Sequence, residues 1–118
     1  MTGQPDEAAK RPGRHVRSIA GRTVAFDDEA FFESFEDWSE DLFEELARES
    51  GIAPVTDRHR RVIRFLREYY AYNARAPLNN QLRTGTGMSL LELNGLFPEG
   101  IKMGARRLAG LPNPKTCT

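Results

Sequence analysis

Apolar side chains recur at helical spacing in the first half of the chain. Trp38, Leu42 and Leu46 follow one another at intervals of four residues, with the apolar Phe43 and Ala47 beside them. This spacing predicts an amphipathic helix that begins at Asp37 as its N-cap and ends before Gly51. Acidic side chains in its first turn favour the same start, because the N-terminal end of a helix attracts negative charge.

A longer helix of about 16 residues is predicted to follow Thr56 as its N-cap and to end near Asn73. One face is broadly apolar, as expected of a helix that packs against a core. This face contains Val62, Ile63, Phe65, Leu66, Tyr69 and Tyr70. The other face carries five arginines, Arg58, Arg60, Arg61, Arg64 and Arg67. We expect Tyr69 and Tyr70 of the apolar face to lie in the core, together with Phe31, Phe32 and Trp38.

Three short helices are predicted after residue 73. The first spans residues 77–82 and stops at the Gly-Thr-Gly sequence of residues 85–87, because glycine breaks regular structure. The second spans residues 89–93, with a serine as its N-cap. The last spans residues 101–108 and ends at Gly110.

The ends of the chain have different patterns. Residues 1–17 have few large apolar side chains, so we expect a disordered N-terminal tail. Residues 19–26 are rich in β-branched side chains around a Gly21-Arg22 turn, which predicts a hairpin. Two prolines within residues 111–118 predict a flexible, extended C-terminal arm. The predicted fold is therefore mainly α: a small orthogonal bundle of about five helices over residues 18–110, with an N-terminal hairpin.

Composition narrows the function classes. A chain of 118 residues forms one small domain, too small to enclose a large cofactor, and we expect no cofactor. No apolar run is long enough to span a membrane and no signal peptide is evident, so we expect a soluble, cytoplasmic protein. A single cysteine excludes an intrachain disulfide, and with only His15 and His59 it makes a zinc site improbable.

The net charge of zero conceals a strong segregation along the sequence. Residues 26–50 have a net charge of −10, whereas residues 1–25 have +3 and residues 51–118 have +7. The simpler interpretation is that the acidic and basic segments pair within the fold. The alternative is that part of the basic surface faces a partner.

Cys117 is the residue most suggestive of chemistry. It lies on the predicted arm, where few side chains are available to bury it. A thiol with an ordinary pKa of about 8.5 is a weak nucleophile by itself. No histidine or aspartate lies on the arm to activate it. A thiol on a movable arm is suited to entering a partner's active site and exchanging sulfur there. His59, in the first turn of the long helix, is better explained as a structural or capping side chain.

The sequence resembles the DsrC/TusE sulfur-carrier family. The resemblance covers residues 19–118 and is strongest at the Gly-Leu-Pro-Asn-Pro sequence of residues 110–114, which leads to Cys117. Further matching positions, in the family's order, are Asp37-Trp38-Ser39, Thr56 with His59, Phe65 to Tyr70, and Leu96-Phe97-Pro98. The chain departs from the family pattern at Arg60, at Asn80 and in a shortened segment between Arg83 and Ser89.

The resemblance implies a sulfur carrier that accepts sulfane sulfur as a persulfide on Cys117 and passes it to an acceptor protein. TusE-type members serve tRNA wobble-uridine 2-thiolation, whereas DsrC-type members serve dissimilatory sulfite reductase and use a second arm cysteine. Arg106 occupies that second position here, which favours the TusE-like interpretation. The implied partners are sulfur-donor relay proteins and an acceptor enzyme, either a tRNA thiolase or a sulfite-reductase-like complex.

Two alternatives remain open at this point. A helix-turn-helix regulator would use Arg58, Arg61 and Arg64 to contact nucleic-acid phosphates. An interaction subunit would insert its arm into a partner without transferring sulfur, and would therefore tolerate replacement of Cys117.

Overall fold

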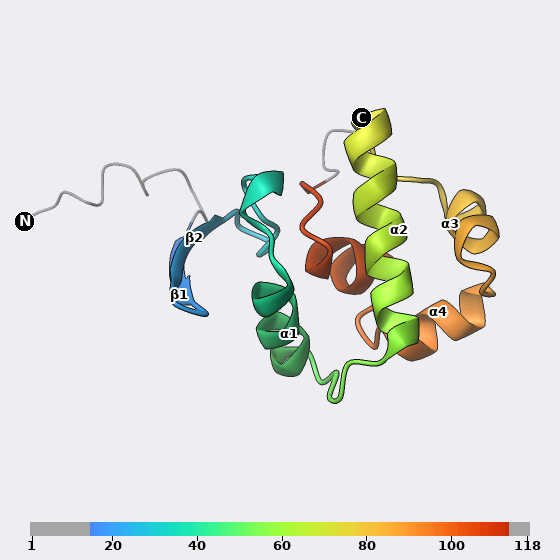
Figure 1. Cartoon of the computed structure of the whole chain (residues 1–118), viewed down its shortest axis with the longest axis horizontal. Helices are drawn as coiled ribbons and strands as arrows, with labels where there is room; N and C mark the ends of the chain where they lie inside the picture. The colour runs from blue at the N-terminus through green and yellow to red at the C-terminus, as the bar shows by residue number, and fades with distance from the viewer. Residues whose placement is uncertain (1–14, 114–118) are drawn as a thin grey trace, which may run out of the picture.

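The computed structural model describes residues 15–113 as a two-stranded hairpin followed by helices (Figure 1). The strands are β1 (His15–Ile19) and β2 (Arg22–Phe26), and a 3₁₀ turn, η2 (Phe35–Asp37), leads into the helical part. The helices are α1 (Glu40–Glu49), α2 (Asp57–Asn73), α3 (Asn79–Thr86) and α4 (Leu90–Leu96), followed by the π-helical turn η3 (Ile101–Arg106). The prediction of a mainly helical fold with an N-terminal hairpin is confirmed.

The hairpin differs from the prediction in its turn and in its length. β1 and β2 pair antiparallel with Ile19 opposite Arg22, so the turn is Ala20-Gly21 rather than Gly21-Arg22. Both turn residues have positive φ, 52° and 77°, as the tight turns that match strand twist require. β1 begins at His15, so the predicted boundary of the tail at residue 17 is wrong for residues 15–17. Residues 1–14 lie outside the described residues.

The N-cap of α1 is Ser39 rather than Asp37. The Ser39 side chain accepts a hydrogen bond from the Leu42 amide at 3.3 Å, whereas Asp37 belongs to η2. Both residue types cap helices well, so sequence alone does not decide between them. The predicted end is confirmed, because Gly51 follows the C-cap with φ 86°.

The long helix α2 agrees with the prediction at both ends. Thr56 caps it through a hydrogen bond from the His59 amide, and Asn73 is its last residue. In Figure 1, α2 lies between α1 with η3 on one side and α3 with α4 on the other. It is the element around which the helical part is arranged.

The predicted break at Gly85 is wrong, because α3 continues through Thr86 and ends at Gly87 with φ 72°. A Cβ atom at Gly85 would lie 2.2 Å from Cε1 of Phe65, on α2. Glycine at this position is therefore explained by the close approach of α3 to α2 and not by a break in the helix. The helix after Ser89 is also longer than predicted and reaches Leu96.

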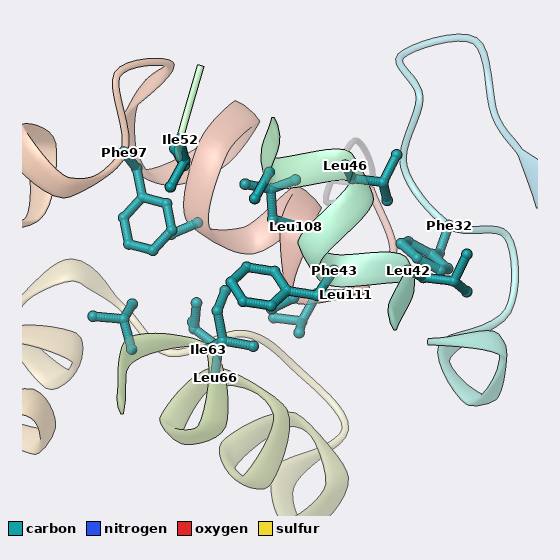
Figure 2. Packing of buried hydrophobic residues seen from close by; sticks show 14 of the residues in the cluster. Phe32, Leu42, Phe43, Leu46, Ile52, Ile63, Leu66, Phe97, Leu108 and Leu111 are labelled. Carbon is teal, nitrogen blue, oxygen red and sulfur yellow. The ribbon is translucent and has the colours of Figure 1, made fainter. Parts of the chain in front are cut away.

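The core lies between α1, α2 and η3, with Phe43 of α1 among Ile63, Leu66 and Leu108 (Figure 2). Of the predicted aromatic core, Phe31 and Phe32 are fully buried, and Trp38 and Tyr70 are partly buried against it. Tyr69 is only partly buried and donates a hydrogen bond to Gln81. The described residues contain no helix long and apolar enough to cross a membrane.

Pairing between the acidic and basic segments is confirmed at three places. Arg60 of α2 contacts Glu40 and Glu44 of α1 at 3.1 and 2.5 Å. Other pairs across the fold join Arg17 to Glu49 and Lys102 to Glu29. Part of the segregated charge is therefore neutralised within the molecule.

Candidate functional site: the anchor of the C-terminal segment

The candidate functional residue, Cys117, lies outside the described residues. The structure instead describes the segment that precedes it, up to Asn113. Leu111 is 1% exposed and belongs to the core, so the predicted boundary of the arm at residue 111 is wrong for this residue. Trp38 and Arg67 hold the segment immediately before Leu111, and Gly110 of that segment fits between their side chains.

Trp38 binds this segment through its indole group. Its Nε1–H donates a 2.8 Å hydrogen bond to the carbonyl oxygen of Leu108, seventy residues later in the chain. Leu108 is completely buried, so its carbonyl depends on a partner from the protein. Trp38, which lies between η2 and the N-cap of α1, thus connects the start of the helical part to its end.

Arg67 of α2 binds the next residue of the segment. Its Nη1 donates to the Ala109 carbonyl at 2.9 Å, and its Nη2 donates to the Phe35 carbonyl at 3.2 Å. The guanidinium carbon lies 3.9 Å from the Phe35 ring centre and 4.4 Å from that of Trp38. Burial lowers the pKa of Arg67, and the carbonyl dipoles with the two aromatic faces compensate the buried charge.

Gly110 fits closely between these two side chains. A Cβ atom there would lie 2.8 Å from Trp38 Cδ1 and 3.0 Å from Arg67 Nη1, and the φ of Gly110 is 80°. Both the space and the backbone angle therefore require glycine. The chain leaves this anchor in a fixed direction toward Pro112.

The sequence singles out Trp38, Arg67 and Gly110 but does not indicate that they act together to hold the segment before Leu111. Trp38 was expected in the core and Arg67 on a charged face, while Gly110 was expected to end a helix. All three belong to motifs that carry the family resemblance. Residues 38, 67 and 110 are far apart in sequence, so only the fold shows that they converge. The motifs that carry the resemblance thus build the base of the Cys117 segment.

His59 has the structural role that the sequence predicted. Its Nδ1 accepts a 3.1 Å hydrogen bond from the Thr56 amide, which completes a capping box. Its Nε2 lies 2.9 Å from the Leu96 carbonyl, and its ring meets the Phe97 ring edge-on at 5.4 Å. Both ring nitrogens are engaged, so His59 connects α2 to the end of α4.

The arginines proposed for a nucleic-acid surface are not equivalent. Arg58 pairs with Glu92 at 2.6 Å, and Arg61 contacts the Thr86 carbonyl at 3.5 Å. Arg64 is exposed. One of the three charges is therefore neutralised by a carboxylate of α4, which weakens the case for a phosphate-binding face.

Comparison with known proteins is decisive for the family. The model of the family described as "DsrC like protein" matches residues 18–118. The chain belongs to this family. The match includes the anchor residues Trp38, Arg67 and Gly110, and extends to Cys117.

Relatives of two kinds are found. The chain is 36% identical over 97 residues to the "Sulfite reductase, dissimilatory-type subunit gamma" of Nitratidesulfovibrio vulgaris, covering 82% of this chain and 92% of the relative. It is 35% identical over 104 residues to "Sulfurtransferase TusE" of Pectobacterium atrosepticum, covering 82% and 94%.

Solved structures of DsrC-like chains share this fold. A chain in the crystal structure of dissimilatory sulfite reductase I matches with a TM-score of 0.83 and 35% identity, covering 88% of this chain and all of that chain. The oxidised gamma subunit of dissimilatory sulfite reductase (DsrC) from Archaeoglobus fulgidus matches with a TM-score of 0.77 and 29% identity, again over 88% and 100%. The DsrC-like fold is therefore shown by sequence and by structure.

Proposed function

We propose that this protein is a sulfur carrier whose Cys117 accepts sulfane sulfur as a persulfide and transfers it to an acceptor protein. The observation that carries the proposal is the conjunction of the anchor with the sequence that follows it. Trp38 and Arg67 bind the carbonyls of Leu108 and Ala109, and the sole cysteine of the chain comes a few residues later. Relatives named sulfurtransferases support the same chemistry.

The transfer is a thiol exchange reaction that balances without an external oxidant. The Cys117 thiolate attacks the terminal sulfur of a donor cysteine persulfide, a new S–S bond forms, and the donor S–S bond breaks. The donor cysteine leaves as a thiolate, so the sulfane sulfur moves with no net oxidation. Because the chain has one cysteine, the persulfide has no second thiol in the same molecule to displace it, and sulfur leaves by transfer to another molecule.

We propose the sulfur relay that leads to tRNA wobble-uridine 2-thiolation as the process served, in the cytoplasm, with relay proteins as donors and a tRNA thiolase as acceptor. The single thiol and the relatives named TusE support this assignment. A second candidate is delivery of sulfur in dissimilatory metabolism, because the relative of 36% identity is named a sulfite reductase subunit. The two differ in the acceptor that removes the sulfur.

The experiment is intact-mass analysis of the protein after incubation with a persulfidated donor. We expect a gain of one sulfur, about 32 Da, in the wild type and none in Cys117→Ser. A gain that survives Cys117→Ser overturns the proposal. Transfer of radioactive sulfur from the loaded protein to tRNA, in the presence of a tRNA thiolase, then separates the first candidate from delivery to a sulfite reductase complex.

A simple inserting arm and a nucleic-acid regulator make different predictions. An inserting arm would support partner binding equally well in the wild type and in Cys117→Ser. A regulator would bind DNA with an affinity that falls steeply with salt and that does not depend on Cys117. Loss of function in Cys117→Ser with partner binding intact supports sulfur transfer over both.

A further inference from the structure

Arg106 is a half-buried cation whose charge is poorly compensated. Its Nη2 donates a 2.8 Å hydrogen bond to the Pro77 carbonyl, whereas its buried Nε has no hydrogen-bond partner among the described residues. No carboxylate pairs with it among residues 15–113. A buried N–H without an acceptor lowers the stability of the fold, and a buried charge without a counter-ion lowers it more.

The other partly buried arginines of the described chain are compensated. Arg60 has two glutamates of α1, and Arg107 has Glu99 at 2.8 Å. Arg67 lacks a carboxylate partner but has two carbonyls and two aromatic faces. Arg106 has one carbonyl, and desolvation lowers its pKa with no opposing effect from a nearby acid.

Arg106 lines an open hollow of about 380 Å³ between the start of α3 and η3. Lys102, one turn earlier, lines the same hollow, and Asn79 brings the N-terminal end of α3 to it. The hollow is completed by Leu78 and Ile101, so no acidic side chain of the part of the chain that the structure describes lines it. Lys102 also pairs with Glu29, whose Oε1 lies 3.5 Å from the Lys102 ammonium and is not part of the lining of the hollow.

The surroundings of the hollow favour negative charge further. The N-cap residue of α3, Leu78, has no polar side chain to accept from the first amides of the helix, although the Gln81 side chain accepts a 2.8 Å hydrogen bond from the Leu78 amide itself. The first backbone N–H groups of a helix have no partner within the helix and carry a partial positive charge. Two cations, an amide side chain and a helix N-terminus whose N-cap side chain accepts no hydrogen bond therefore converge on one hollow, and none of the described residues that line it is a carboxylate.

We propose that this hollow binds a small tetrahedral inorganic oxyanion, with Arg106 as the principal ligand and Lys102 as the second. A planar guanidinium is suited to the oxygens of such an anion, and Lys102 adds a mobile point charge. The volume accommodates a tetrahedral oxyanion with its remaining water. The inference stands independently of the sulfur carried on Cys117.

The test is a titration of the full chain with sodium sulfate and, separately, sodium thiosulfate at constant ionic strength. The readouts are the Nε–H signal of Arg106 and the backbone amide signals of Asn79 and Lys102, observed by NMR. We expect saturable shifts of all three. Binding should weaken about tenfold or more in Arg106→Met, by a smaller factor in Lys102→Met, and not at all in Arg83→Met, which removes an exposed cation of α3.

Two results would overturn the proposal. The first is the absence of saturable shifts, or equal shifts in the wild type and in a folded Arg106→Met variant. The second is a change in the Arg106 signal between the wild type and Cys117→Ser before any anion is added, since this would assign the hollow to the thiolate of the chain itself. Failure of the persulfide assay leaves this test unaffected, so the two proposals fail separately.

Discussion

The indole nitrogen of Trp38 donates a hydrogen bond to the carbonyl of Leu108 at 2.8 Å. This bond crosses seventy residues of sequence and fixes the backbone just before the segment that leads to Cys117. Arg67 repeats the arrangement one residue later, at Ala109. The family motifs around Trp38 and Arg67 are therefore explained by their binding of the C-terminal backbone.

Trp38→Phe should reduce the free energy of unfolding by about 1–2 kcal/mol, because the variant keeps an aromatic ring and leaves the buried Leu108 carbonyl without its donor. Urea titration followed by circular dichroism measures this, since Trp38 is the sole tryptophan and its fluorescence is lost. Tyr72→Phe, at a side chain that is 91% exposed, is the control and should change stability by less than about 0.5 kcal/mol. Equal effects of the two variants would mean that the indole bond contributes nothing.

Gly110→Ala should be more damaging than Gly51→Ala. Both glycines have positive φ, 80° and 86°, so both substitutions incur the backbone cost of about 1–2 kcal/mol. Only at Gly110 would the new methyl group meet Trp38 and Arg67 within 3.0 Å, which adds about 1–3 kcal/mol. Nothing lies within 4 Å of a Cβ at Gly51. The difference between the two midpoints of thermal unfolding isolates the packing effect, and similar midpoints would contradict it.

His59→Ala should destabilise the fold by about 2 kcal/mol, because it removes the acceptor for the Thr56 amide and the partner of the Leu96 carbonyl. His59→Gln should recover part of this loss, since glutamine serves in capping boxes at the same position. The yield of persulfide per folded molecule should be unchanged in both variants. A His59→Gln protein that folds normally but accepts no sulfur would instead make this histidine part of the chemistry.

The ion pair between Arg17 and Glu49 should make a small contribution that disappears in acid. Arg17 donates two hydrogen bonds to Glu49, at 3.1 and 2.7 Å, and this lowers the pKa of Glu49 in the folded state. The stabilisation is present above the unfolded pKa of about 4.3 and is lost as the pH falls through the lower folded pKa. Both side chains are more than 40% exposed, so screening limits it to less than about 1 kcal/mol.

Urea titrations of the wild type and Glu49→Gln at pH 7 and pH 3 test this sign. The wild type should be the more stable at pH 7, and the difference should shrink at pH 3. A difference that is equally large at both pH values would attribute the effect of Glu49 to packing rather than to its charge.

Local sequence patterns predicted the bounds of those elements that have a recognisable capping residue and a regular apolar face. Thr56 and Asn73 bound the long helix as expected, because its cap and its apolar face agree. The errors occur where a distant residue decides. Gly85 reads locally as a helix breaker, yet the Phe65 ring of α2 needs the space that glycine leaves.

The same limit applies to the candidate site. Leu111 looks like the first residue of a proline-rich arm, and only the packing of α1, α2 and η3 shows that it is buried. The sequence singled out Cys117 through its chemistry and the resemblance, but it gave no reason to connect Trp38 with Arg67. Their convergence depends on tertiary contacts that no local pattern encodes.

Because Leu111 is held in the core, the length of chain after it limits the distance between Leu111 and the Cys117 thiol. Cys117 is the sixth residue after Leu111, and a fully extended chain of that length spans at most about 20–22 Å. Under the proposed function, any donor or acceptor must therefore bring its reacting cysteine within that distance of Leu111.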